Sequence, residues 1–182
     1  MIEQLAFQLE RGGLIPTSPL QMHIKEVGVV SACLLNKQWH SRLPHIDWSN
    51  VVRCREYICY GAKFNCEWYA VAIWSDAVAA NRMKDGDKVL ELRRMAISPE
   101  APRYTASWML GRMVKDIKKR YPYLVKLISY QDTEVHNGTI YKASGWSVGG
   151  SSKGSSWTTN TRKRNTEQTM ADKIRWELDL VK

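Results

Sequence analysis

The segment from Val89 to Trp146 constrains the fold more than any other part of the sequence, because two kinds of apolar pattern alternate along it. The short apolar run Val89–Ser98 ends at a proline, as expected for a buried strand. After Pro102 the sequence predicts an amphipathic helix, with Thr105 as its cap. Apolar residues recur there at helical spacing, namely Met109, Leu110, Met113, Val114 and Ile117.

A second strand and a second helix follow in the same order. Pro122 ends the first helix, and Leu124–Tyr130 is again short and apolar. The stretch Gln131–Trp146 is predicted to contain a short helix that breaks at Gly145. This strand–helix–strand–helix order is typical of an α/β fold.

The flanking segments predict more strands and one more helix. Leu20–Gln38 has the apolar spacing of a helix, and Tyr57–Ser75 predicts a hairpin that turns at Phe64 and Asn65. Lys173–Leu180 alternates strictly between apolar and charged residues, as a half-buried strand does. The Gly/Ser-rich run Ser147–Trp157 is expected to be flexible.

Length and composition favour one domain with a polyanionic partner. The 182 residues suffice for a single core, so we expect an arm at residues 1–19, one domain at 20–182 and a closing hairpin at about 155–180. A net charge of +9 favours a polyanion. No apolar run approaches the ~20 residues of a membrane span, so we expect no membrane partner and a cytoplasmic location.

The four cysteines show no CxxC spacing. Reduced, buried thiols are the expected state of Cys33, Cys54, Cys59 and Cys66. A structural zinc site is the alternative, although no histidine stands at finger spacing.

Five segments, taken in order, resemble the Mom family of phage DNA-modification proteins. They lie between Leu34 and Trp146 and read WHSRLP, LELRRMAI, APRYTASWML, LISYQDTEVH and GTIYKASGW. The last is also similar to the YxxxGF ending of the final helix in GCN5-related acetyltransferases (the GNAT superfamily). The resemblance implies a GNAT-like acyltransferase fold, with a central, mostly antiparallel mixed sheet flanked by helices.

The resemblance also implies a reaction and a setting. The protein would be a phage or prophage enzyme in the bacterial cytoplasm that converts adenine in double-stranded DNA to N6-carbamoylmethyladenine. The modified DNA would escape host restriction. Two alternatives stay open: a GNAT N-acetyltransferase that uses acetyl-CoA on a protein or small amine, and a non-catalytic DNA-binding protein.

Four residues are candidates for catalysis. The resemblance places His40 and the following hydroxyl residue, Ser41, at the active site; a surface or capping histidine is the alternative for His40. Asp132 follows a strand, where an acid can act as general base or can cap the next helix. Tyr141 matches the tyrosine that protonates the leaving group in many GNAT members, and a core aromatic is its alternative.

Two further residues are candidates for binding the substrate. Arg94 lies amid apolar residues of a strand and needs a partner if it is buried, either an acid such as Asp132 or the substrate. His136 faces either a cleft or solvent. His40, Asp132 and His136 are also residue types that suit iron or zinc, so a metal stays open.

The donor is expected at the start of the helix after Pro102. GNAT members hold coenzyme A there with a Q/R-x-x-G-x-G/A turn. Arg103 fits the first position, and Thr105 and Ser107 could help to bind an anion, but both glycines are missing and Tyr104 and Trp108 would crowd a pyrophosphate. The donor is therefore either acetyl-CoA or a glycine-derived acyl group, since glycyl and carbamoylmethyl groups are isomers.

Two basic clusters are candidates for contacting DNA phosphates. One lies on the predicted helix and the other at the tip of the closing hairpin, where a solvated turn is the alternative. Their residues are Lys115, Lys118, Lys119, Arg162, Lys163 and Arg164.

Overall fold

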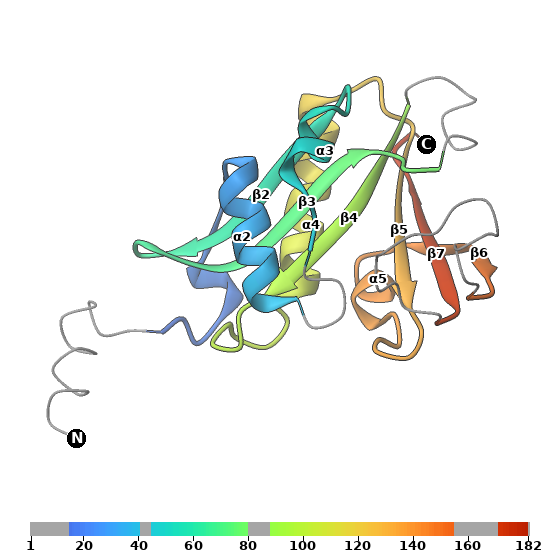
Figure 1. Ribbon diagram of the computed structural model, residues 1–182. Helices are drawn as coiled ribbons and strands as arrows, with labels where there is room; N and C mark the ends of the chain where they lie inside the picture. Colours follow the sequence, from blue (N-terminus) through green and yellow to red (C-terminus); the bar gives the residue numbers. More distant parts are fainter. Residues whose placement is uncertain (1–14, 41–44, 80–87, 155–170, 182) are drawn as a thin grey trace, which may run out of the picture.

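A computed structural model describes residues 15–40, 45–79, 88–154 and 171–181 (Figure 1). Its strands form one sheet in the order β1-β2-β3-β4-β5-β7-β6, in which β4 and β5 are parallel and all other neighbours antiparallel. This confirms the predicted mixed, mostly antiparallel sheet. The strands are β1 (His23–Glu26), β2 (Tyr57–Phe64), β3 (Glu67–Asp76), β4 (Val89–Ile97), β5 (Lys126–Asp132), β6 (Ser147–Ser152) and β7 (Lys173–Asp179).

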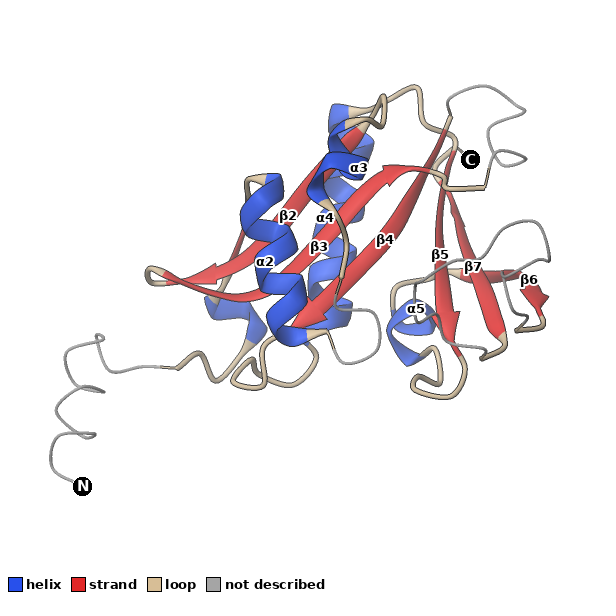
Figure 2. Ribbon diagram, in the orientation of Figure 1, coloured by secondary structure: helices blue, strands red, loops and turns tan. Residues whose placement is uncertain are grey.

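Helices cover both faces of this sheet (Figure 2). The two long helices, α2 and α4, lie on opposite faces, with α2 in front of the sheet and α4 behind it in the view of Figure 1. A 3-10 turn, η1, precedes β1. The bounds are η1 (Pro19–Gln21), α2 (Val29–Trp39), α3 (Trp48–Val52), α4 (Thr105–Arg120) and α5 (Thr139–Ala143).

Alternation along the central strands gives each face its own core. In β3, Ala72 and Trp74 pack in the cluster that includes α4, whereas Val71 and Ile73 pack in the cluster that includes α2 and α3. All four side chains are fully buried. A side chain of the central sheet can therefore be assigned to the α2 face or the α4 face from its position in the register.

The helix predicted over Leu20–Gln38 is wrong in its first half. His23–Glu26 forms the edge strand β1, which pairs with β2, and the helix begins only at Val29 with Gly28 as its N-cap. Apolar spacing alone could not distinguish these four residues from a helical turn, because tertiary pairing with β2 decides their conformation.

The Gly/Ser-rich segment predicted to be flexible instead forms strand β6 at Ser147–Ser152. It pairs with β7, and Gly149 makes this pairing possible, because a Cβ at that position would collide with the side chain of Glu177. The glycine thus serves a close approach between strands.

The other predicted elements are confirmed with small shifts at their ends. The hairpin of β2 and β3 turns through Asn65, which has a φ of 51°. Strand β5 begins two residues later than expected, and the cap of α4 is Tyr104, with Thr105 as the first helical residue. Ser41 and the basic tip of the closing hairpin lie outside the described residues.

The two halves of the sheet meet over a short length. Strands β4 and β5 pair only from Val89 to Leu92 and from Lys126 to Ser129. Beyond this point β4 continues against β3 and β5 continues against β7. A bulge opposite Ile73 and Trp74 in β3 interrupts the β4 register just where the two strands separate. The resulting divergence of β4 and β5 positions the candidate site.

The four cysteines are free, as predicted, but only Cys33 and Cys59 are buried. Burial raises the pKa of the Cys59 thiol to about 12, so this side chain stays a neutral core residue. Cys66, in the turn of the β2–β3 hairpin, is exposed and does not fit the expectation of a buried thiol.

Candidate functional site

Three of the predicted residues come together on the α2 face where β4 and β5 diverge. Arg94 pairs in register with Ile73, whose side chain belongs to the α2 core, so Arg94 projects toward α2. His40 ends α2, and its imidazole lies close enough to both Arg94 and His136 to be affected by their charges. The helix end, the strand and the loop after β5 thus converge, although they are far apart in sequence.

This environment keeps the imidazole of His40 neutral. Burial, the Arg94 guanidinium and His136 together lower the pKa of His40 to about 4. The backbone amide of His40 donates to the carbonyl of Asn36 (2.8 Å), which fixes the residue at the helix end. A neutral imidazole can accept a proton from a substrate at neutral pH.

Arg94 is half-buried, and its guanidinium lacks a complete set of partners among the described residues. One guanidinium nitrogen, Nη1, donates to the carbonyl of Arg93 (2.7 Å), whereas Nε is buried and has no acceptor among the described residues. Burial and the nearby Arg93 lower the pKa of Arg94, and Glu91 opposes that shift. A buried donor of this kind is expected to be satisfied by a ligand or by water.

Asp132 does not cap the next helix, because α5 begins at Thr139 with Gly138 as its N-cap. Its Oδ1 accepts from the amide of Glu134 (3.0 Å) within the loop, and its backbone carbonyl accepts from the amide of His136 (3.1 Å). Oδ2 is buried and has no partner in the described part of the chain. Asp132 therefore shapes the loop that carries His136, and its Oδ2 remains available to a ligand.

Tyr141 is a core residue whose hydroxyl reaches the point of divergence. Its ring stacks on Trp176 at 5.3 Å between centroids, and its hydroxyl lies 2.8 Å from Ser129 Oγ. The hydroxyl of Ser129 in turn bonds to the carbonyl of Leu92 (3.3 Å), and these two residues form the last parallel pair of β4 and β5. Burial raises the pKa of Tyr141, so the phenol remains protonated and able to donate.

The expected donor site is a pocket of about 340 Å³ between the start of α4 and α5. Ala106 and Ser107 line it, and their amides belong to the first helical turn, whose N–H groups have no intrahelical acceptor. The Thr105 hydroxyl donates to the carbonyl of Pro102 (2.7 Å) and that of Ser107 to the carbonyl of Tyr104 (3.1 Å). Both hydroxyls therefore shape the turn itself.

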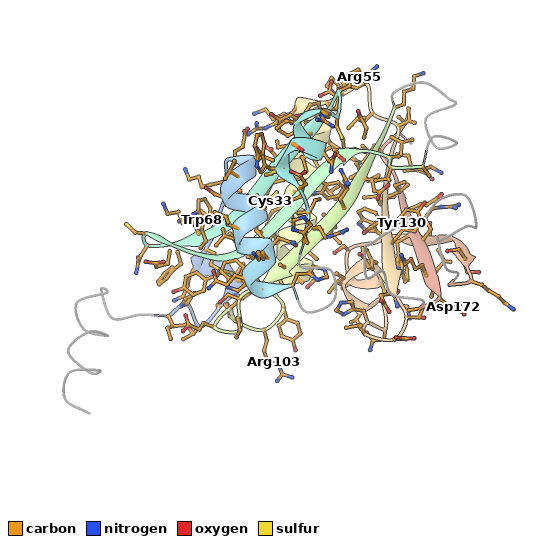
Figure 3. All side chains as sticks on the ribbon, in the orientation of Figure 1. Cys33, Arg55, Trp68, Arg103, Tyr130 and Asp172 are labelled. Atoms are coloured by element: carbon orange, nitrogen blue, oxygen red, sulfur yellow. The ribbon has the colours of Figure 1, made fainter. Side chains whose placement is uncertain are left out.

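The turn reaches its special conformation without glycine. Tyr104 has a φ of 68°, in the left-handed region that a bulky residue rarely adopts, and its side chain is 77% exposed at the edge of the pocket. Arg103 points outward from the same turn (Figure 3). Trp108 lines a separate groove on the other side of α4, so the expectation that it crowds the donor is wrong.

These features fit a donor that carries an anionic group. The helix start supplies amides and the positive end of the helix dipole, and Arg103 adds a cation nearby. Ile97, Ile140 and Ala143 give the remaining wall an apolar surface for an acyl chain. When bound, such a donor would supply an activated acyl carbon.

The residues predicted to contact DNA phosphates do not belong to this site. Lys115, Lys118 and Lys119 are exposed on α4, across the sheet from His40. The basic hairpin tip lies outside the described residues. No group of three or more metal-ligating side chains occurs among the residues that the structure describes.

Sequence reasoning missed two residues that support the site. Ser129 is the one serine or threonine in an apolar strand, and this exception could have drawn attention to it. Gln131 donates to the carbonyl of His136 and accepts from Trp176 Nε1 (2.7 Å), so it anchors the loop of His136 to the core. No pattern in the sequence pairs Gln131 with a tryptophan 45 residues later.

Solved structures with the same fold are acetyltransferases. The ribosomal-protein-S18-alanine N-acetyltransferase from Escherichia coli has 13% identity and a TM-score of 0.62, with 87% of this chain and 94% of that chain covered. A spermidine N-acetyltransferase from Vibrio cholerae, solved with CoA and spermine, has 11% identity and a TM-score of 0.61, covering 88% and 96%. At these identities the likeness shows the GNAT fold alone.

An acetyltransferase from Bacillus subtilis in complex with CoA gives the same result, with 12% identity, a TM-score of 0.61 and coverage of 88% and 99%.

No curated protein matches the sequence. Among the described helices, none has the length and apolarity that crossing a membrane requires. The model of the Mom protein family matches residues 24–178, most of the chain, and this protein therefore belongs to the Mom family.

Proposed function

We propose that this protein modifies adenine in double-stranded DNA at its exocyclic amine, giving N6-carbamoylmethyladenine. The family and the GNAT fold support an acyltransferase-like role. The observation that carries the proposal is the neutral His40 held beside Arg94 and His136 at the divergence of β4 and β5. In phage-infected bacteria this modification would protect phage DNA from restriction.

The described residues can divide the work of one transfer step. The adenine amine attacks the acyl carbon of the donor, a C–N bond forms, and the bond from that carbon to the leaving group breaks. His40 accepts the proton that the amine loses, and the Tyr141 hydroxyl donates a proton to the leaving group. The unsatisfied Nε of Arg94 binds the reacting carbonyl oxygen as negative charge develops on it.

The product limits the choice of donor. An acetyl group from acetyl-CoA contains no nitrogen, whereas a carbamoylmethyl group needs one. A glycyl group has the same atoms as a carbamoylmethyl group. After glycyl transfer, a rearrangement would break the bonds from N6 to the carbonyl carbon and from CH2 to NH2, and would form bonds from N6 to CH2 and from the carbonyl carbon to NH2, so it balances without another reactant. The pocket at the start of α4 suits either donor, because amides and Arg103 bind whatever anion the leaving group carries.

The enzyme can reach the adenine amine only if the base is flipped out of the base stack. The amine is shielded by pairing and stacking, so the adenine would flip into the site at a cost of a few kcal/mol. The positive net charge of the chain favours the phosphate contacts that offset this cost.

The test is nucleoside mass spectrometry on DNA from bacteria that express the protein. We expect an adenine derivative heavier by one glycyl or carbamoylmethyl unit, and incorporation of isotopically labelled glycine would identify the donor. The peak should vanish with His40→Ala and persist with His45→Ala, a matched change of an exposed histidine that lines neither pocket. Soluble protein that leaves DNA unmodified would count against the proposal.

An N-acetyltransferase that acts on a protein or small amine is the second candidate. The pocket at the start of α4 and the fold shared with CoA-bound acetyltransferases favour it. Tight binding of acetyl-CoA together with unmodified DNA would support this alternative. Duplex binding without either property would instead support a non-catalytic DNA-binding protein.

A further inference from the structure

The outer face of α4 carries a concentration of unpaired positive charge. Four exposed cations of this helix form no ion pair within the described part of the chain; they are Arg112, Lys115, Lys118 and Lys119. The only acid of the helix, Asp116, is bound to Arg120 (2.7 Å) and accepts from the Tyr60 hydroxyl (2.7 Å). These four cations are therefore available to bind an anionic ligand.

A groove of about 630 Å³ continues the basic face toward the edge strand β1. One wall is a stripe of α4 residues spaced by four, and the other wall is β1. The α4 stripe consists of Trp108, Arg112, Asp116 and Arg120. Arg112 lies 6.0 Å from the centroid of the Trp108 ring, and Lys25 adds an unpaired cation from β1. An aromatic ring beside cations suits a nucleic-acid strand.

This face and the two groups assigned to the adenine amine and the reacting carbonyl, His40 and Arg94, lie on opposite sides of the sheet. His40 and Arg94 are on the α2 face, whereas α4 packs against the other face with Met109, Met113 and Ile117. The helix adds about 10 Å of thickness beyond its packing surface. A straight stretch of duplex that delivers an adenine to the α2 face cannot also lie along the outer face of α4.

We infer that the basic face of α4, with the groove beside β1, is a second DNA-binding surface, which holds a different segment of duplex from the one being modified. This inference rests on the proposed function only in taking DNA as the polyanion. The surface recognises phosphates and not sequence, since it offers lysines and an arginine to the backbone. It keeps the enzyme on long DNA between successive modifications.

The test uses two labelled duplexes and the full chain. One duplex is fixed to beads, the other carries a dye, and capture of the dye reports that the protein bridges them. The doubly substituted variant Lys118→Glu/Lys119→Glu should lose bridging. Lys88→Glu/Lys153→Glu, which makes the same change in net charge outside α4, should retain it. Melting temperatures would confirm that both variants fold.

Affinity for a single duplex gives a second readout that does not depend on catalysis. For the α4 variant we expect binding at low salt to weaken about tenfold and the slope of log affinity against log salt to fall by about 2. Equal bridging and equal salt slope for the α4 and control variants would overturn the inference, whereas loss of the modified nucleoside alone would bear only on the proposed function.

Discussion

The two faces of strand β4 carry different kinds of side chain, apolar on one and charged on the other. Toward α4 it presents Leu90 and Leu92, which are buried in the larger core. Toward α2 it presents Glu91 and Arg94, charged groups that are buried or nearly so. The difference lies in successive residues of one strand, because side chains alternate between the faces of a sheet.

The charged groups on the α2 face lower the stability of the fold, and we expect them to act in the reaction. On the α4 face the buried groups are uncharged: the Trp74 indole donates to the sulfur of Met113 at 3.2 Å, whereas the indole nitrogens of Trp108 and Trp146 have no partner among the described residues. On the α2 face Glu91 and Arg94 have pKa values shifted by burial, each toward its neutral form. Burying charges is costly, so a fold keeps them where they act on a ligand.

The largest effect is expected on the α2 face, from His40→Ala. Removing the base should lower the rate of DNA modification by ~10²- to 10⁴-fold, while the free energy of unfolding changes by no more than ~1 kcal/mol. Quantitative nucleoside mass spectrometry and urea denaturation would measure the two quantities. A folded variant with the full rate would remove His40 from the mechanism.

The converse is expected on the α4 face, from Met113→Ala. The side chain is fully buried and accepts from Trp74, so its truncation should lower the free energy of unfolding by ~2–5 kcal/mol. Modification by the protein that remains folded should be little changed. An unaltered urea midpoint would show that this face does not carry the stability of the fold.

A smaller loss is expected where the faces meet, from Ser129→Ala. The change leaves the buried Tyr141 hydroxyl without its observed partner, which costs ~1–3 kcal/mol. Because the phenol also loses its orientation, the modification rate should fall as well. Ser144→Ala, a change to a part-buried hydroxyl on the C-cap of α5, is the control and should affect neither quantity as much.

The turn before α4 allows a change in the opposite direction. Tyr104→Gly relieves the left-handed backbone of a bulky residue and should raise the free energy of unfolding by ~1 kcal/mol. Thermal melting would measure the gain. A decrease in melting temperature would mean that the Tyr104 side chain contributes more through its contacts than its backbone costs.

The last prediction concerns how the contribution of His40 to stability depends on pH. Its pKa falls from the ordinary 6.5 to about 4 on folding, so the unfolded chain binds more protons between these values. The contribution of His40 to stability is therefore complete above pH 6.5 and is lost as the pH falls toward 4. Denaturation at several pH values should show a shallower loss for His40→Ala, and parallel curves would contradict the lowered pKa.

The sequence predicts the parts of this fold that follow from local patterns. The stripe at Met109, Met113 and Ile117 indicated α4, and the alternation at Ile174 and Trp176 indicated β7. Strand β1 was missed because four residues next to a helix carry no distinct period, and β6 was missed because glycine and serine usually indicate a loop. In both segments the partner strand determines the structure.

The candidate site was predictable in its residues but not in its arrangement. His40, Arg94 and Asp132 could be selected as chemically capable groups at element ends or in an apolar strand. That His40 meets Arg94 and His136 depends on the packing of α2 against β4, which no spacing in the sequence encodes. That Arg94 Nε and Asp132 Oδ2 lack partners among the described residues likewise becomes visible only in the three-dimensional structure.

The brief pairing of β4 with β5 has a mechanical consequence. Four residues on each of these strands join the two halves of the sheet. One half consists of β1, β2, β3 and β4, and the other of β5, β7 and β6. Because this seam has fewer paired residues than the β2–β3 hairpin, its amides should exchange hydrogen with solvent sooner than those inside the hairpin. We therefore expect bending between the two halves of the sheet to concentrate at Leu92 and Ser129.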